Sequence, residues 1–360
     1  MTEVPASTAD YAALARARLP EDVWHYLNGG AGDEVTLAAN VSAFRRLAVR
    51  PRVLVDVRRR DATTRVLGTA LAAPIGVAPM AYHRLAHPDG EAATARAAAA
   101  EGLLMIASTF ASRPIEEVAA AAPGRVWFQI YCFRDHGLTD ELIKRAEEAG
   151  CRALVLTADT PLMGWRDRDI RHRFLLPDGV EAANLRGLAG PGDDLAAVTR
   201  DLLDPGVTWT AVERIRGVTD LPVVLKGVLT AEDAALAVEC GVSGVIVSNH
   251  GGRQLDGAIA ALDALAEVAG AICHLSERVE VYLDGGVRRG IDVLKALALG
   301  ARAVFVGRPV LWGLAAAGEE GARGVLRLLK AELDVAMALS GRPAVAELGR
   351  DAVCPAGGCS

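Results

Sequence analysis

Short apolar runs recur along the chain and alternate with alanine-rich amphipathic stretches. The run Val245-Ile246-Val247 is typical, because three β-branched residues in succession indicate a strand buried on both faces of a parallel sheet. Similar runs occupy 75–78, 103–106, 126–130, 153–156, 223–225, 245–247, 281–283 and 303–306, and helical stretches between them include 90–101, 139–150, 231–241 and 290–300. Eight such units predict an α/β fold, a (β/α)8 TIM barrel, with an open doubly wound sheet as the alternative.

Two segments depart from this rhythm. We expect an N-terminal helical segment over residues 1–50 and a lid-like insert of about residues 160–208 after the fourth strand. The chain between Asp159 and Leu221 is about twice as long as a βα connection needs. No shift in composition marks a domain boundary, so we expect a single domain over 1–360.

Composition narrows the functional classes. The net charge is −6 with both signs interspersed, which gives no electrostatic basis for nucleic-acid binding. No apolar run approaches the ~20 residues that span a bilayer, and the first residues do not resemble a signal peptide. The six cysteines are scattered and lack zinc-site spacing, so we expect free thiols, no metal, and a loose tail at the terminal CPAGGCS. A cytoplasmic protein is the expectation.

Chemically useful residues follow the predicted strands at their carboxyl ends. A barrel gathers these ends at one mouth, so residues far apart in sequence should converge there. Asp159 alone could be a helix cap and Lys226 a rim charge, but repetition at eight strand ends favours a site. The set comprises Pro79, Met80, Ala81, Ser108, Gln129, Tyr131, Thr157, Asp159, Lys226, Ser248, His250, Arg253, Asp284, Gly286, Arg288, Gly307 and Arg308, with Arg166 soon after the fourth strand.

Two of these groups suggest particular chemistry. His250 and Arg253 are three residues apart in SNHGGRQLDG, which suits a base beside an anion clamp. Glycines and an arginine after the last two strands are typical of a barrel phosphate site, which would take a phosphorylated substrate or cofactor. Glycines that merely make tight βα turns are the ordinary alternative.

Several short motifs of the chain resemble those of a known family. The strings SNHGGRQLD, DGGVRRG, GRPV, LKGV and FQIY, with an early Tyr-x-x-Gly-Gly-Ala at Tyr26, resemble the FMN-dependent 2-hydroxy acid oxidases and dehydrogenases. These include glycolate oxidase, lactate oxidase, mandelate dehydrogenase and hydroxymandelate oxidase. The resemblance runs from about Tyr11 to Gly341.

The resemblance implies a role for each residue. Near the isoalloxazine of FMN it places Pro79, Met80, Ala81, Ser108, Gln129 and Thr157, with Lys226 by N1 and the C2 carbonyl; Ser248 also belongs to the cofactor set. It assigns the ribityl phosphate to Asp284, Gly286, Arg288, Gly307 and Arg308. It implies that Tyr26, Arg166 and Arg253 bind the substrate carboxylate. Tyr131 would contact the substrate hydroxyl, and His250, oriented by Asp159, would be the base. Lys226 and Tyr131 complete the catalytic group.

The implied activity is oxidation of an (S)-2-hydroxy acid to the 2-oxo acid, with O2 reduced to H2O2. Phe110, where glycolate oxidase has tryptophan, and Tyr82 favour an aromatic substrate such as mandelate or 4-hydroxymandelate. We expect oxygen as the acceptor because neither a haem-binding domain nor a hydrophobic insert is visible. The alternatives are a lactate- or glycolate-type oxidase, a dehydrogenase with another acceptor, a flavin barrel that modifies a peptide, and a catalytically idle scaffold. The resemblance also implies a homo-oligomer, a tetramer or octamer.

Overall fold

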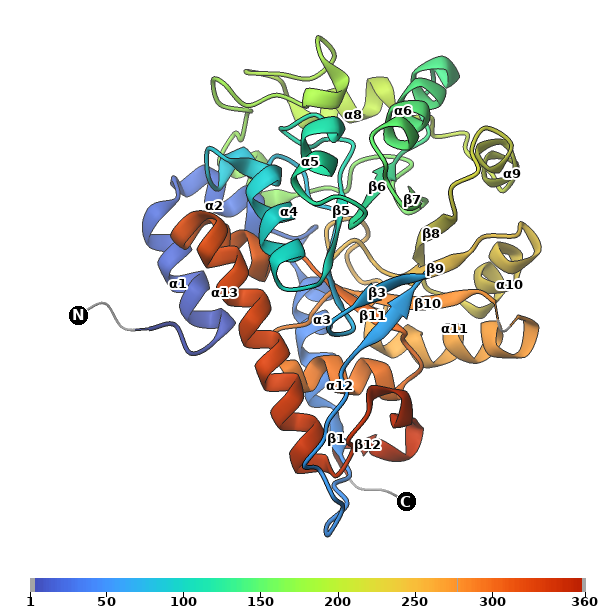
Figure 1. The fold of residues 1–360 in the computed structure, drawn as a ribbon. Helices are drawn as coiled ribbons and strands as arrows, with labels where there is room; N and C mark the ends of the chain where they lie inside the picture. The colour runs from blue at the N-terminus through green and yellow to red at the C-terminus, as the bar shows by residue number, and fades with distance from the viewer. Residues whose placement is uncertain (1–3, 277, 358–360) are drawn as a thin grey trace.

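Eight parallel strands close into a barrel at the centre of the chain (Figure 1). The computed structural model describes residues 4–276 and 278–357. In chain order the barrel strands are β4 (Ile75–Val77), β5 (Leu104–Ala107), β6 (Val126–Ile130), β7 (Leu154–Thr157), β8 (Val223–Val228), β9 (Gly244–Val247), β10 (Glu280–Asp284) and β11 (Ala303–Val306). Strand β11 pairs with β4, so the sheet has no open edge and the predicted TIM barrel is confirmed.

A helix follows each barrel strand and covers its outer face. These helices are α4 (Gly90–Ala100), α5 (Ile115–Ala121), α6 (His136–Glu148), α9 (Thr210–Arg216), α10 (Ala231–Glu239), α11 (Ala261–Leu275), α12 (Gly290–Ala298) and α13 (Arg308–Ser340). Helix α13 is broken at Ala317 and Gly318, whose backbone angles are not helical. Among residues 4–276 and 278–357, no helix is both long and apolar enough to cross a membrane.

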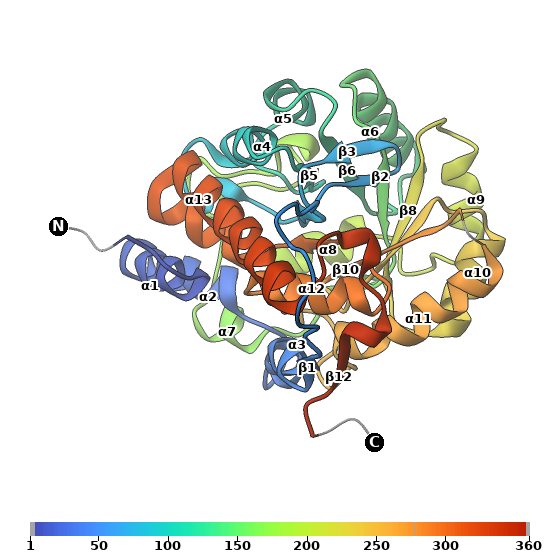
Figure 2. The same ribbon diagram turned by 60° about the horizontal axis from the view of Figure 1, so that its bottom comes forward.

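The chain outside the barrel forms three additions. The N-terminal residues form α1 (Thr8–Arg18), α2 (Glu21–Asn28) and α3 (Val35–Arg45), and α1 lies alongside α13 (Figures 1 and 2). The segment predicted as a lid contains α7 (Asp167–Arg171), η2 (Ala183–Leu185) and α8 (Leu195–Leu202). The remaining short elements are β1 (Leu47–Val49), β2 (Thr64–Val66), β3 (Thr69–Leu71), η1 (His83–Leu85), η3 (Val345–Glu347), η4 (Arg350–Ala352) and β12 (Val353–Pro355).

The C-terminal tail is more ordered than its composition suggests. Strand β12 pairs antiparallel with β1, with Cys354 opposite Ala48, so the expectation of a loose tail was wrong for Cys354 and Pro355. Backbone pairing with an available strand outweighs the weak local preference of a Pro- and Gly-rich segment. Cys359 lies outside the described residues. Of the others, Cys132, Cys151, Cys240 and Cys273 are free thiols, as expected.

The barrel interior is filled at one end and polar at the other. Trp127, Tyr282 and Phe305 pack with ring centroids 5.6–5.7 Å apart and fill the interior toward the amino ends of the strands. Side chains two residues apart on a strand point to the same face. Gln129 and Asp284, two positions further along β6 and β10, therefore also point inward and line the cavity above the aromatic layer, and Gly307, directly after β11, lines it too.

Helix α3 fastens the loop that follows β9. The Asn40 side chain donates to Asn249 Oδ1 and accepts from Asn249 Nδ2, both at 2.8 Å, and it also accepts from the Ala261 backbone N–H at 3.1 Å. Both asparagines are buried. Residues 248–253 are thus held against the N-terminal segment by a pair of reciprocal amide hydrogen bonds.

We therefore expect Asn40→Ala to lower the free energy of unfolding by about 1–3 kcal/mol, because it removes both hydrogen bonds to the buried Asn249 amide and the acceptor of the Ala261 N–H. The exposed Ser42 on the same helix offers a control, and Ser42→Ala should change the free energy by less than about 0.5 kcal/mol. Urea titrations of the three proteins provide the measurement. Equal stability of the Asn40 and Ser42 variants would contradict this account of the loop.

Candidate active site

A cavity opens at the carboxyl ends of the barrel strands. Its volume is about 1270 Å3, the open mouth included. The N-terminal segment, the insert and all eight strand ends contribute to its walls. Among its lining residues are the predicted Tyr26, Pro79, Met80, Ala81, Ser108, Gln129, Tyr131, Thr157, Arg166, Lys226, His250, Arg253, Asp284, Gly286, Arg288, Gly307 and Arg308.

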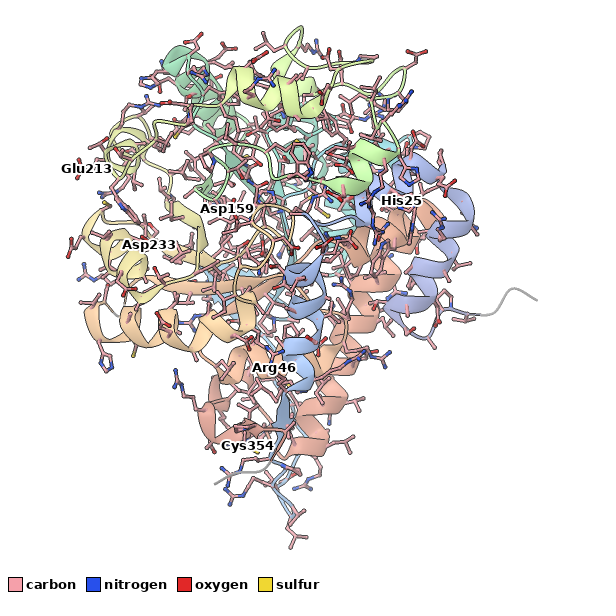
Figure 3. The ribbon with its side chains drawn as sticks, turned by 180° about the vertical axis from the view of Figure 1, so that it is seen from behind. His25, Arg46, Asp159, Glu213, Asp233 and Cys354 are labelled. Atoms are coloured by element: carbon pink, nitrogen blue, oxygen red, sulfur yellow. The ribbon has the colours of Figure 1, made fainter. Side chains whose placement is uncertain are left out.

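Two predicted residues lie behind the cavity wall. Asp159 does not line the cavity, but its carboxylate contacts His250, which does. Figure 3 labels Asp159 near the middle of the view from behind. Ser248 is fully buried, and its hydroxyl accepts a hydrogen bond from the His250 backbone N–H at 3.0 Å. Ser248 therefore shapes the His250 loop in this structure, and its cofactor role stays a prediction.

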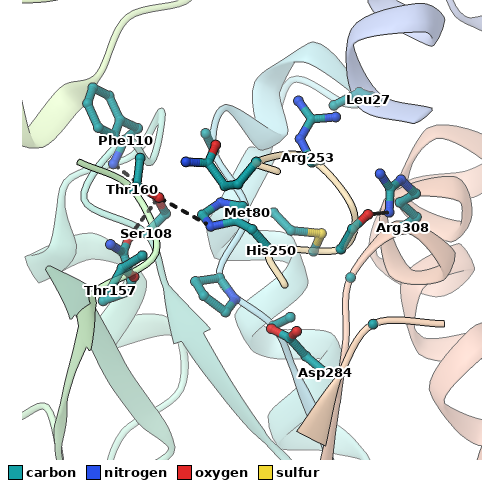
Figure 4. Close-up of a pocket in the computed structure, with 18 of the residues that line it drawn as sticks. Leu27, Met80, Ser108, Phe110, Thr157, Thr160, His250, Arg253, Asp284 and Arg308 are labelled. Carbon is teal, nitrogen blue, oxygen red and sulfur yellow. Dashed lines mark hydrogen bonds between the residues drawn. The ribbon is translucent and has the colours of Figure 1, made fainter. Parts of the chain in front are cut away.

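His250 is oriented by an acid behind it. Its Nδ1 lies 2.8 Å from Asp159 Oδ1, and the Thr160 hydroxyl donates to the same oxygen at 3.0 Å. The Thr160 hydroxyl is also 3.4 Å from Nδ1, a contact drawn in Figure 4. Burial lowers the pKa of His250, and Asp159 opposes this only in part, so the pKa lies below its ordinary value. Since Nδ1 faces the carboxylate, Nε2 is the nitrogen left to exchange a proton with a ligand.

Lys226 lies between two carboxylates at the end of β8. Its Nζ is 3.6 Å from Asp284 Oδ2 and 3.9 Å from Asp159 Oδ2. Burial alone would lower the pKa of Lys226, but Asp284 and Asp159 outweigh it, so the pKa is raised and the ammonium stays charged. Burial likewise would raise the pKa of Asp159, yet His250 and Lys226 lower it to about 2.

Gly227 makes this packing possible. Its φ is +110°, and a Cβ at this position would lie 2.6 Å from Asp159 Cβ. A side chain here would push Asp159 away from both His250 and Lys226. The glycine after Lys226 therefore lets Asp159 lie close to both His250 and Lys226.

Arginines gather on the opposite side of the cavity and are held by backbone carbonyls. Arg253 donates to Tyr26 O and Gly29 O, both at 2.8 Å, and Arg308 donates to Gly29 O at 2.8 Å and Gly251 O at 3.0 Å. Arg166 Nε donates to Arg253 O at 3.3 Å. Figure 4 shows Arg253 and Arg308 across the cavity from Thr157 and Phe110.

The charge on the cavity wall is unbalanced. Lys226 and four arginines (Arg166, Arg253, Arg288 and Arg308) line it, whereas Asp284 is the single lining carboxylate within residues 4–276 and 278–357. Burial, and for Arg166 also the charge of Arg253, lowers the pKa of Arg166 and of Arg288 to about 10. Buried cations without counter-charges are costly. A site of this kind favours anionic ligands.

The predicted FMN fits the unused hydrogen-bonding groups of the wall. Gln129 Nε2, Thr157 Oγ1, Asp284 Oδ1 and Arg308 Nε are buried and have no hydrogen-bond partner among the described residues. They offer donors and acceptors to a polar ring system, and the arginines offer positive charge to a phosphate. Arg288 stacks over Trp312, with 5.1 Å from Cζ to the ring centroid, which holds its guanidinium in place. The residues present therefore match both halves of the cofactor.

Sequence reasoning missed several lining residues. Thr160, Met163, Gln254, Leu195 and Thr199 all line the cavity. Thr160 directly follows Asp159 and could have been found from that position. Leu195 and Thr199 come from α8 in the insert, four residues apart on one helix face, and nothing in the sequence indicates that this face turns to the barrel.

Comparison with known proteins identifies the chain. The FMN-dependent dehydrogenase family matches residues 15–355. The chain is 48% identical over 348 residues to an L-lactate oxidase of Nostoc sp., covering 94% of each chain, and 48% identical over 347 residues to glycolate oxidase 1 of Zea mays, covering 95% of this chain and 93% of the relative.

Solved structures agree. A crystal structure of mandelate oxidase is similar with a TM-score of 0.91 and 46% identity, covering 98% of each chain, and a mandelate oxidase with (S)-4-hydroxymandelic acid gives the same score and identity, covering 97% of this chain and 98% of the other. The chain therefore belongs to the FMN-dependent dehydrogenase family, as an FMN-dependent 2-hydroxy acid oxidase.

Proposed function

We propose that the protein oxidises an (S)-2-hydroxy acid with an aromatic side chain, such as mandelate or 4-hydroxymandelate, to the 2-oxo acid while O2 is reduced to H2O2. The apolar part of the cavity carries this proposal. Leu27, Phe110, Met163 and Leu195 line it together with the carboxylate-binding candidates. Phe110 packs edge-on against Tyr131 with centroids 5.7 Å apart, which suits a planar apolar side chain nearby.

In this proposal His250 is the general base. Its Nε2 takes a proton from the substrate, and Asp159 stabilises the imidazolium because the carboxylate stays ionised with a pKa of about 2. When bound, FMN supplies the two-electron acceptor that no side chain provides. Burial raises the pKa of Tyr131 above its ordinary value, so its hydroxyl remains protonated and can donate a hydrogen bond to the substrate hydroxyl.

Arg166, Arg253 and Tyr26 hold the substrate carboxylate in this proposal. The Arg253 guanidinium lies 5.2 Å from the Tyr26 ring centroid, and Tyr26 stacks on Phe174 of the insert at 4.2 Å. A guanidinium pair matches a carboxylate with planar, charge-assisted hydrogen bonds. The remaining predicted cofactor residues keep their roles as proposals: Pro79 to Ala81, Ser108, Gln129, Thr157 and Lys226 toward the ring system, and Asp284, Gly286, Arg288, Gly307 and Arg308 toward the phosphate.

A small aliphatic acid is the second candidate, because the chain is 48% identical to both an L-lactate oxidase and a glycolate oxidase. The peptide and scaffold alternatives have no comparable observation in their favour. The predicted cytoplasmic location and homo-oligomer stay predictions.

Oxygen consumption across a panel of hydroxy acids separates these candidates. We expect kcat/KM for (S)-mandelate to exceed that for lactate and glycolate by at least about tenfold. A single methylene in an apolar pocket already changes kcat/KM by about tenfold or more, and a phenyl ring buries more apolar surface than a methylene does. Peptides should not be oxidised. Better turnover of lactate or glycolate would replace the aromatic substrate by a small one.

The phosphate assignment can be tested apart from catalysis. Arg288→Met should weaken FMN binding to the cofactor-free chain by about 1.5–3 kcal/mol, the range for a hydrogen bond to a charged group, and should leave riboflavin, which lacks the phosphate, almost unaffected. Quenching of flavin fluorescence measures both affinities. Arg289→Met, at a half-exposed residue paired with Glu332, is the control. Equal loss of FMN and riboflavin affinity would remove Arg288 from the phosphate site.

The pH dependence follows from the environment of His250. The pKa of His250 lies below the usual value near 6.5, so the base remains neutral to lower pH. The midpoint of the acid limb in the pH profile of kcat/KM for mandelate should therefore lie below pH ~6.5. Asp159→Asn removes the charge that raises the pKa of His250, so this limb should move lower still while kcat drops. A limb above pH ~7 in the unaltered enzyme, or an upward move in the variant, would contradict the assignment.

A further inference from the structure

Asp169 is a buried carboxylate that the proposed reaction does not use. It lies on α7 of the insert, with a side chain 13% exposed, and its Oδ2 is 3.8 Å from Arg166 Nη1. Neither carboxylate oxygen accepts a hydrogen bond from the residues that the structure describes. Buried carboxylates are ordinarily hydrogen-bonded, and this one lacks such bonds. Burial raises its pKa, and the charges of Arg253 and Arg166 oppose that rise.

Arginines, histidines and a tyrosine hydroxyl surround Asp169. Arg166, Arg168 and His172 belong to its own segment, and Arg168 is itself paired with Glu34. Helix α2 contributes His25, which stacks on His172 with centroids 4.0 Å apart, and the Tyr26 hydroxyl. The loop after β9 contributes Arg253, whose charge acts on Asp169 together with that of Arg166. Asp169 thus adds negative charge beside the two arginines assigned to the substrate carboxylate.

Asp169 does not orient these arginines. Arg166 is directed by its hydrogen bond to Arg253 O, and Arg253 by its bonds to Tyr26 O and Gly29 O. The 3.8 Å contact between Asp169 and Arg166 is too long to be a hydrogen bond. Removing the charge of Asp169 should therefore leave the geometry of the pair and change only its electrostatics.

We propose that Asp169 weakens the binding of carboxylate ligands, because it competes electrostatically with the carboxylates of substrate and product for Arg166 and Arg253. This inference rests on the proposed function, which places the carboxylate there. In the free site Asp169 offsets part of the repulsion between the two guanidinium groups. When a ligand carboxylate binds, Asp169 repels it in a poorly screened environment, which weakens retention of the product anion and favours its release.

The test compares an anion with its neutral counterpart. Benzoylformate and benzoylformamide, neither of which can be oxidised as a hydroxy acid, are titrated into the FMN-loaded enzyme and followed by the change in flavin absorbance. Asp169→Asn should bind benzoylformate about tenfold more tightly, a change of ~1.4 kcal/mol. The affinity for the amide should change less than about twofold, because Coulomb repulsion requires the ligand charge.

Three controls make the result specific. Asp167→Asn, on the same helix but paired with Arg171 at 2.6 Å, should keep the anion-to-amide ratio of the unaltered enzyme, and so should the charge-retaining Asp169→Glu. Asp169→Ser should repeat the shift if the Asn variant does not retain FMN.

Equal shifts for anion and amide, or weaker binding of benzoylformate by the neutral variants, would overturn the role of Asp169 alone. An unaltered enzyme that neither binds benzoylformate nor is reduced by mandelate would instead overturn the proposed function, and this inference with it.

Discussion

The site depends on positive charges that are buried together at one end of a closed barrel. Lys226 and four arginines line a cavity with one lining carboxylate, and burial lowers the pKa of Arg166 and Arg288 to about 10. Such an arrangement persists only where other groups compensate it. Asp159, Asp284 and Asp169 supply part of the compensation from the protein, and backbone carbonyls of Tyr26, Gly29 and Gly251 supply more. The remainder points to anionic ligands.

The barrel creates this concentration of charge through strand parity. Large rings such as Trp127 fill the interior at the end away from the cavity, and Gln129, two positions later on the same strand, lines the cavity. A closed sheet brings eight such positions together, which no open sheet does. Loops with demanding backbone geometry then complete the site: His250 has a positive φ of 58°, and Gly286 has a φ of +84° where a Cβ would lie 2.0 Å from Asn40 O. The N-terminal segment is therefore part of the site's construction.

Much of the barrel could be predicted from the sequence because strands buried on both faces leave continuous apolar runs. The predicted strand 126–130 coincides with β6, and 245–247 falls within β9. The same property hides which residues face inward, since both faces are apolar and no alternation is visible. The strand ends nevertheless gave most of the cavity wall, because polar residues interrupt those runs where the strands stop.

The insert was predictable as a long connection, but its contribution to the site was not. Its helices are short, and their positions depend on contacts with distant segments, such as the stacking of Tyr26 on Phe174. Asp169 stands in a run of alternating charges, DRDIRHR, that resembles a solvated helix face, and only its three-dimensional neighbours distinguish it from Asp167.

A crystal structure of the enzyme with FMN and benzoylformate would test the central claim most directly. The account predicts two separate anions in one cavity, with the flavin phosphate within hydrogen-bond distance of Arg288 or Arg308 and the ligand carboxylate within hydrogen-bond distance of Arg166 and Arg253. A carboxylate bound away from both of these arginines, or a phosphate at the other side of the barrel mouth, would contradict it.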